Sequence, residues 1–129
     1  MVYPTGKTVV KTSTIDCEVE SYKLKKLDFI KIDVEGYEYQ VMKGGEKSIK
    51  KFKPIIMYEY SRTIDKLSNT NNSYKSFNLI NRLGYSQYAI IGEKVIWRIS
   101  SFKEDLPDTN IICFPVGKVP LNFKNTPLI

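Results

Sequence analysis

The fold of this chain is decided by residues 27–60, which read LDFIKIDVEGYEYQVMKGGEKSIKKFKPIIMYEY. Residues 27–34 are short, β-branched and almost continuously apolar, which is typical of a strand buried on both faces. Residues 37–52 carry apolar side chains at helical spacing, and Gly44 and Gly45 predict a break into two short helices. Residues 54–60 follow as a second buried strand. A strand, a helix and a strand within about 30 residues predict a βαβ unit with parallel strands.

Shorter elements surround this unit. TVVKTSTID at residues 8–16 is a β-branched run that predicts a short strand, and residues 18–27 predict a short helix or a loop. After the second parallel strand, SNTNNS at residues 68–73 predicts a mobile loop. Residues 74–83 place apolar side chains on one face of a short helix, which we expect to end at Gly84.

The last third of the chain predicts strands. Residues 85–91 and 95–99 flank a Gly-containing turn and predict a hairpin, and residues 110–116 predict a final strand. We therefore expect an α/β fold with a mixed sheet, in which a parallel βαβ core is followed by antiparallel C-terminal strands. No domain boundary is visible, so residues 1–129 are interpreted as a single domain.

Composition excludes several classes of protein. The chain is 42% hydrophobic and 26% charged, as expected for a soluble globular domain, and no apolar run approaches the roughly 18 residues of a membrane span. Its N-terminus lacks the pattern of a secretory signal. Cys17 and Cys113 stand far apart, which predicts reduced thiols in a cytoplasmic protein. The sequence contains no histidine, which excludes Ser-His and Cys-His catalytic pairs.

The formal net charge of +6 makes a basic nucleic-acid-binding domain an alternative. Lysine supplies most of this charge, because the only arginines are Arg62, Arg82 and Arg98. Arginine is the usual side chain for forked recognition of phosphate and guanine, so the sequence gives this alternative little support beyond the charge itself.

Carboxylates follow the two predicted parallel strands, at the ends where ligands bind in open α/β sheets. Asp33 and Glu35 follow the first strand, and Glu59 lies at the end of the second. Neighbouring strands lie about 4.8 Å apart, so we expect Asp33 and Glu59 to converge. Tyr58 and Tyr60 flank Glu59, where they are predicted either to line an acceptor pocket or to pack in the core.

The residues alone leave several roles open for these carboxylates. Close carboxylates raise one another's pKa, so one of them could act as a general base near neutral pH. They could also supply oxygen ligands to Mg²⁺ or Ca²⁺, or form a binding site for a cationic ligand. The structural alternative is an ion pair between Lys31 and Asp33, with Glu35 exposed at the start of a helix.

A resemblance to a known family narrows this choice. DFIKIDVEGYEYQVMKGG at residues 28–45, followed by KPIIMYEY at residues 53–60, resembles the signature of the FkbM family of S-adenosylmethionine-dependent methyltransferases. TSTID at residues 12–16 resembles the segment before that signature, and NIICFP at residues 110–115 resembles the closing strand. The resemblance covers about residues 8–117.

The resemblance implies part of a class I methyltransferase fold, a Rossmann-like sheet of strand order 3-2-1-4-5-7-6. Residues 27–33 would be the fourth strand, residues 54–60 the fifth, the hairpin the sixth and residues 110–116 the last. It also implies methyl transfer from S-adenosylmethionine to a hydroxyl group of a small molecule or glycan. Such a displacement needs an aligned acceptor oxygen and a carboxylate that takes its proton.

The same resemblance implies roles for individual residues. Asp33, Glu35 and Glu59 would be catalytic, with Asp33 beside the cofactor and taking or orienting the hydroxyl proton. Glu35 and Glu59 would position the acceptor or a metal ion. Glu35, Tyr58 and Tyr60 would contact the acceptor, and no metal-ligating residue is assigned.

The chain departs from the family pattern in the half that binds the cofactor. Class I methyltransferases begin with a strand and a glycine-rich turn, whereas this sequence contains no Gly-x-Gly. We therefore expect the C-terminal half of a catalytic domain, whose first parallel strand lies at an exposed sheet edge. A non-catalytic half-domain remains an alternative, pairing through this edge with itself as a homodimer or with a partner that carries the missing N-terminal half.

Overall fold

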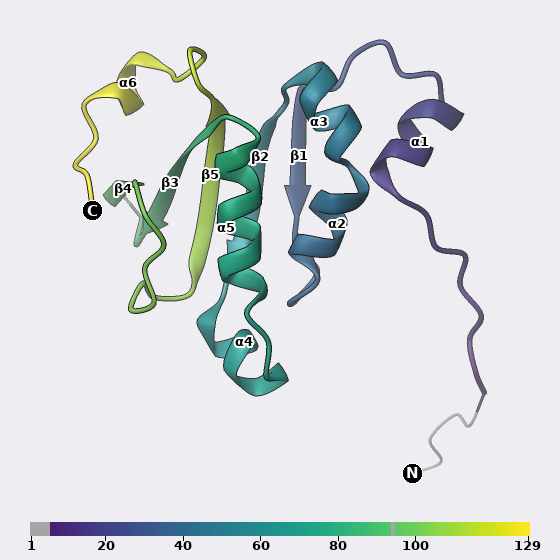
Figure 1. Ribbon diagram of the computed structural model, residues 1–129. Helices are drawn as coiled ribbons and strands as arrows, with labels where there is room; N and C mark the ends of the chain where they lie inside the picture. The colour runs from purple at the N-terminus through teal and green to yellow at the C-terminus, as the bar shows by residue number, and fades with distance from the viewer. Residues whose placement is uncertain (1–5, 94) are drawn as a thin grey trace.

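The computed structural model describes residues 6–93 and 95–129 (Figure 1). The elements occur in the order α1 (Ile15–Ser21), β1 (Phe29–Ile32), α2 (Glu38–Gly44), α3 (Glu46–Phe52), β2 (Ile55–Tyr60), α4 (Arg62–Ser68), α5 (Asn72–Arg82), β3 (Tyr85–Ile91), β4 (Val95–Ile99), β5 (Thr109–Pro115) and α6 (Leu121–Lys124). Within the described ranges, every helix is too short or too polar to cross a membrane.

The five strands form one mixed sheet in the order β1-β2-β5-β3-β4. β1 and β2 are parallel, with Lys31 opposite Met57, whereas β5 runs antiparallel to both β2 and β3. β3 and β4 form the expected hairpin. The predicted α/β class with a mixed sheet is therefore confirmed, and the order β1-β2-β5-β3 matches strands 4-5-7-6 of the order that the resemblance implies.

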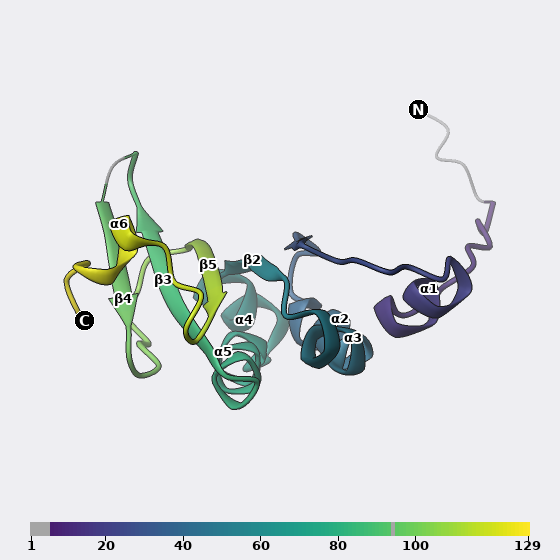
Figure 2. The same cartoon turned by 90° about the horizontal axis from the view of Figure 1, so that it is seen from above.

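One face of this sheet is covered by helices. Figure 2 shows α2, α3 and α5 on the same side, where they enclose the hydrophobic core. The largest core side chains come from both layers and include Met42, Ile49, Ile56, Tyr58, Phe77 and Ile80. On the opposite face, α6 packs its Phe123 ring 5.3 Å from Tyr88 and 4.9 Å from Phe114, measured between ring centroids.

The predicted βαβ unit is confirmed, including its internal break. α2 ends at Gly44 and α3 begins at Glu46, so the glycine pair separates two short helices as expected. The pair has a second use, because a Cβ atom at Gly45 would lie 2.9 Å from the Ile15 side chain of α1. Glycine thus ends α2 and also lets α1 approach α3 closely.

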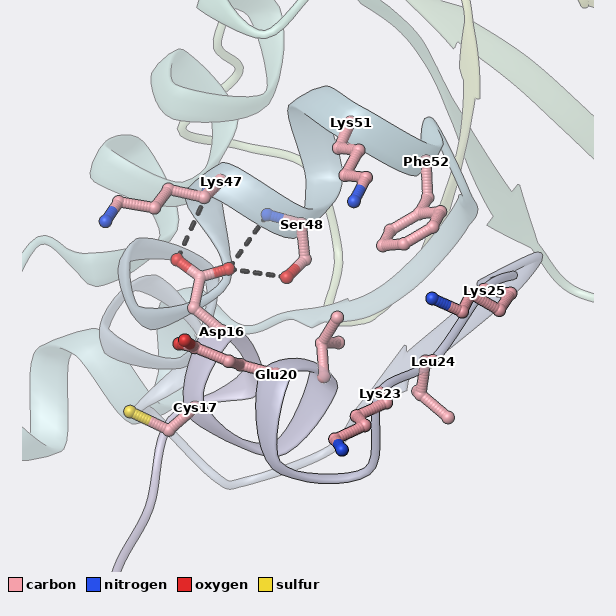
Figure 3. A pocket seen from close by; sticks show the side chains of 11 residues that line it. Asp16, Cys17, Glu20, Lys23, Leu24, Lys25, Lys47, Ser48, Lys51 and Phe52 are labelled. Atoms are coloured by element: carbon pink, nitrogen blue, oxygen red, sulfur yellow. Dashed lines mark hydrogen bonds between the residues drawn. The ribbon is translucent and has the colours of Figure 1, made fainter.

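The strand predicted over residues 8–16 is wrong. The described residues before Ile15 form no strand, and α1 begins there because the Thr14 hydroxyl accepts a hydrogen bond from the Cys17 N–H, at 3.1 Å. Asp16 then ties α1 to α3, since its carboxylate accepts hydrogen bonds from Ser48 and Lys47 (Figure 3). Local capping therefore prevails over the β-branched character of the run.

The loop predicted over residues 68–73 is also shorter than expected. α4, which the sequence did not reveal, ends at Ser68, and α5 already begins at Asn72. The Ser61 hydroxyl caps α4 by accepting from the Ile64 N–H, at 3.1 Å. Buried Asp65 accepts hydrogen bonds from the Arg62 guanidinium and the Ser73 N–H, which joins the two helices.

The two edges of the sheet differ. At β4, backbone hydrogen bonds of 2.9 Å join Arg98 to Pro127 and to Ile129, so the end of the chain covers this edge. At β1, no described residue pairs with the outer edge of the strand. Burial of β1 on both faces was predicted, but Phe29 is 49% exposed because the strand lies at the edge of the sheet.

Candidate functional site

The candidate site is an acidic rim at the carboxyl ends of β1 and β2. Ile32 lies opposite Tyr58 in the parallel register, so the next residues, Asp33 and Glu59, follow side by side. Because side chains alternate along a strand, Glu59 points to the face that the helices of the core do not cover. The structure thus brings together the two carboxylates that the sequence predicted to converge.

The environment of Glu59 shifts the pKa of its carboxyl group. Burial raises the pKa of its carboxyl group, and the negative charges of Asp33, Glu38, Asp108 and Glu35 raise it further. A carboxylate that binds its proton more readily than usual is a better general base near neutral pH. The arrangement therefore provides a proton acceptor at the strand ends.

Asp33 is more exposed and already has a partner. Its carboxylate lies 3.6 Å from the Lys31 ammonium group, and the two side chains are 58% and 57% exposed. This is the ion pair that the structural alternative predicted, and an exposed pair of this kind contributes little to stability. Asp33 still acts on the rim through its charge, which is one cause of the raised pKa of Glu59.

Glu35 lies in a turn that its neighbours hold in an unusual shape. Its φ is 48°, in the left-handed region that side chains other than glycine rarely adopt. The buried Glu38 carboxylate accepts hydrogen bonds from the Val34 N–H at 3.2 Å and the Gly36 N–H at 3.0 Å. The Asn72 amide donates to the Gly36 carbonyl, at 2.5 Å. These contacts fix Glu35 at the rim.

Asp108 also belongs to this rim, although sequence reasoning did not identify it. It accepts hydrogen bonds from the Ser61 hydroxyl at 2.9 Å and the Thr63 N–H at 3.3 Å. Burial raises its pKa, but the hydrogen bonds of Thr63 and Ser61 outweigh this effect and lower the pKa overall. Its only signal in the sequence is its position directly before β5, which pairs with β2.

The sequence left Tyr58 and Tyr60 either beside an acceptor or in the core, and the structure places both in the core. Both are fully buried on the helix-covered face, opposite to Glu59. The Tyr58 hydroxyl donates to Gln87 Oε1 at 2.8 Å, and the Tyr60 hydroxyl donates to the Lys103 carbonyl. Neither ring reaches the rim, so both tyrosines take the packing role and the predicted contact with an acceptor is wrong.

Metal binding finds no support in the geometry of the rim. Within residues 6–93 and 95–129, no three His, Cys, Asp or Glu side chains are grouped so that they could hold a metal ion. A pocket of about 420 Å³ between α1 and α3 is lined by the carboxylates Asp16 and Glu20 as well as four lysines, as Figure 3 shows, and none of the rim residues lines it.

The glycines of the described chain do not form a cradle for S-adenosylmethionine. A Cβ atom at Gly36 would lie 2.8 Å from Ile64, and Cβ atoms at Gly44 and Gly45 would lie against α1, so the protein itself fills these positions. The other described glycines have no heavy atom within 4 Å of such a Cβ. The described residues therefore do not fit this cofactor without further groups.

Comparison with known proteins gives one family result. A family profile described as "Methyltransferase FkbM domain" matches residues 3–88. This span includes more than half of the chain, with the rim residues Asp33, Glu35 and Glu59 inside it. No curated protein and no solved structure matches the chain significantly.

Proposed function

This chain belongs to the methyltransferase FkbM family, and from that premise we propose that it supplies the acceptor side of an S-adenosylmethionine-dependent O-methyltransferase. The observation that carries the proposal is the half-buried Glu59 carboxyl group, whose pKa is raised at the ends of two parallel strands. A hydroxyl group must lose its proton when its oxygen is methylated. Glu59 is the group best suited to accept that proton.

The proton transfer can be written on residues of this chain. The acceptor hydroxyl donates a hydrogen bond to a Glu59 carboxylate oxygen, and its proton passes to that oxygen as the acceptor oxygen gains nucleophilic character. Asp33 and Glu35 surround this carboxylate with negative charge, which makes it more basic. We therefore assign proton acceptance to Glu59 and a supporting electrostatic role to Asp33.

Binding of the methyl donor needs residues beyond those that form the rim. The outer edge of β1 is free among the described residues, and it adjoins Asp33. We propose that a strand carrying the glycine-rich turn pairs along this edge. Backbone hydrogen bonds are the usual way in which an exposed strand accepts another.

The proposal is tested by titrating the Glu59 carboxyl carbon by NMR in the purified chain. We expect a pKa above the ordinary value of 4.5, and Asp33→Asn should move it back toward that value. When the chain is combined with the polypeptide that carries the glycine-rich half, transfer of a labelled methyl group from S-adenosylmethionine should fall about 10²-fold in Glu59→Gln but not in Glu20→Gln, an exposed glutamate of α1. An ordinary pKa for Glu59, or unchanged transfer in Glu59→Gln, would refute the assignment.

The free edge of β1 also favours a second candidate function, that of a non-catalytic half-domain which pairs through this strand. Phe29, which lies in this edge strand, is 49% exposed. Light scattering should then report a dimer that Lys31→Pro dissociates. The Asp28 carbonyl accepts from the Ile55 N–H of β2, so alternation along the strand turns the Lys31 N–H toward the outer edge, and proline removes that donor. A wild-type monomer would eliminate this candidate.

A further inference from the structure

A small pocket lies on the face of the sheet opposite to α2, α3 and α5, where α6 packs (Figure 2). Its volume is about 200 Å³, and it is lined by Ser86, Tyr88, Arg98, Gly117, Val119 and Lys124. Among these side chains are an arginine, a lysine and two hydroxyl groups. No rim residue lines the pocket, so a ligand bound here is separate from the proton transfer proposed for Glu59.

Strand pairing directs the polar side chains of the pocket to one face of the sheet. Tyr88 and Arg98 lie directly opposite each other in the β3–β4 hairpin, so their side chains leave the same face. Ser86 lies two residues before Tyr88 on β3 and points to that face as well. The ring of Phe123 packs 5.3 Å from that of Tyr88, between centroids, which brings the next residue of α6, Lys124, to the pocket. The pocket is therefore built by two paired strands and α6.

The Tyr88 hydroxyl is the group that points most directly to a ligand. The other buried tyrosines, Tyr58, Tyr60 and Tyr85, each donate their hydroxyl to a protein oxygen. Tyr88 is only 2% exposed, yet its hydroxyl has no partner among the described residues and is not one of the atoms sealed from solvent. It therefore opens into the pocket that Tyr88 lines. Because buried hydroxyl groups are nearly always hydrogen-bonded, we expect its partner to come from outside the chain.

The charge of the pocket is positive and is not neutralised by its neighbours. Arg98 and Lys124 are exposed, and neither forms an ion pair within the part of the chain that the structure describes. β3, β4 and residues 109–129 contain no Asp or Glu. The lysine pocket between α1 and α3 differs in this respect, since Asp16 and Glu20 line it. A surface of one charge sign attracts ligands of the opposite sign, so this pocket favours an anion.

The donors of the pocket restrict the kind of anion. The Arg98 guanidinium can bind two oxygens of one group as a fork, Lys124 adds a compact charge, and the hydroxyl groups can each donate once. These donors exceed what the two oxygens of a carboxylate can accept. A phosphate monoester offers three oxygens and a charge of about −1.5 to −2 at pH 7. The volume is below the roughly 300–1,000 Å³ that drug-sized ligands occupy, so one such group fills the pocket.

We propose that this pocket binds a phosphate group, either free phosphate or the phosphate monoester of a small molecule whose remainder extends into solvent. The Arg98 fork and the Tyr88 hydroxyl recognise its oxygens, and Lys124 balances its charge. The site lies on β3 and β4, and β5 separates it from the strand that carries Glu59. The proposal therefore goes beyond the proposed function and gives the chain a second ligand.

The test is a titration of the ¹⁵N-labelled chain with methyl phosphate at constant ionic strength, followed by NMR. Shifts are expected at the Arg98 Nε–H and the Tyr88 amide. Arg98→Gln should weaken binding about tenfold and Tyr88→Phe about fivefold, because each removes a donor to a charged group. Arg82→Gln is the matched control, because it removes the same charge from an exposed arginine at the end of α5 that does not line the pocket. It should bind as tightly as the wild type.

Other anions complete the test. Acetate should bind about tenfold more weakly than methyl phosphate, because it offers fewer oxygens and less charge. Inorganic phosphate distinguishes the two sources of the group: binding at least as tight as that of methyl phosphate assigns the pocket to free phosphate, and weaker binding assigns it to an organic ester.

The Tyr88→Phe variant keeps the ring that packs on Phe123, and an unchanged melting temperature would confirm that its fold is intact. Four results would each overturn the proposal. They are the absence of shifts at millimolar methyl phosphate, equal binding of acetate, wild-type binding in Tyr88→Phe, and a loss of binding in Arg82→Gln as large as that in Arg98→Gln.

Discussion

Asp16 provides the sharpest test of how the TSTID segment works, and replacement by alanine is the perturbation. The Asp16 carboxylate accepts hydrogen bonds from the Ser48 N–H at 2.8 Å, the Ser48 hydroxyl at 2.6 Å and the Lys47 N–H at 3.2 Å. α1 contains no fully buried side chain. We therefore expect α1 to depend on this carboxylate for its attachment to α3.

The magnitude follows from the three bonds. A hydrogen bond to a charged group contributes about 1.5–3 kcal/mol, but Asp16 is only half-buried, so water replaces part of what is lost. Loss of a side-chain acceptor at a helix start costs about 0.5–2 kcal/mol, and we expect about 2 kcal/mol for Asp16→Ala. Because every 1.4 kcal/mol is a tenfold change, local opening of α1 should become about 30-fold more frequent.

Hydrogen exchange measures this local opening directly. Amides of α1, such as the Tyr22 N–H that bonds to the Glu18 carbonyl, should lose protection, while amides of β2 and β5 keep theirs. Asp28→Ala is the control, because Asp28 forms only an exposed pair with Lys26. Unchanged protection of α1, or an equal loss throughout the sheet, would show that Asp16 does not hold α1.

The effect should also depend on pH. Burial raises the pKa of Asp16, but the hydrogen bonds of Ser48 and Lys47 outweigh this effect and lower the pKa overall. Because the pKa is lowered in the folded state, the Asp16 carboxylate stabilises the fold when the pH is above its ordinary pKa of 3.8. This stabilisation is lost as the pH falls below that pKa. Wild type and Asp16→Ala should therefore converge in acid, which exchange at two pH values would show.

Three further predictions concern the rim and the core. At neutral pH, Glu59→Gln should unfold at a higher temperature than the wild type, because a carboxyl group whose pKa is raised in the folded state destabilises the fold when it is ionised. Below pH 4.5 the two proteins should unfold at the same temperature. A lower melting temperature of the variant at neutral pH would contradict this. Glu35→Gly should raise the free energy of unfolding in urea by about 1 kcal/mol by relieving the left-handed backbone, whereas Glu35→Gln should leave it unchanged, and equal effects of the two variants would contradict this. Tyr58→Phe should lower that free energy by about 1–2 kcal/mol, because Gln87 Oε1 loses its buried donor. An unchanged free energy of unfolding in this variant would show that the hydrogen bond between Tyr58 and Gln87 does not stabilise the core.

Much of the central fold was predictable because its signals are local. The apolar runs of β1 and β2, the glycine pair between α2 and α3 and the proline before β2 each specify their own structure. The strand prediction at residues 8–14 was wrong because a strand depends on a distant partner and not on local signals alone. A β-branched run becomes a strand only if another strand is available to pair with it, and here a threonine cap begins a helix instead.

The rim was predictable only in part. Parallel register places Asp33 beside Glu59, and this follows from the pattern of two neighbouring strands. Alternation along β2 already puts Tyr58 and Tyr60 on the face opposite to Glu59, so their burial could have been inferred. The position of Asp108 could not have been inferred from the sequence, because it depends on β5 inserting between β2 and β3 from a distant part of the chain.

The difference between the two edges of the sheet limits the assemblies that copies of this chain can form. Fibrils need a sheet that accepts a new strand on each side in turn, so that every addition creates the next docking place. Here the last residues of the chain already occupy the β4 side. If two copies joined along β1, the described residues of neither copy would offer another open strand edge, and growth would stop at that pair.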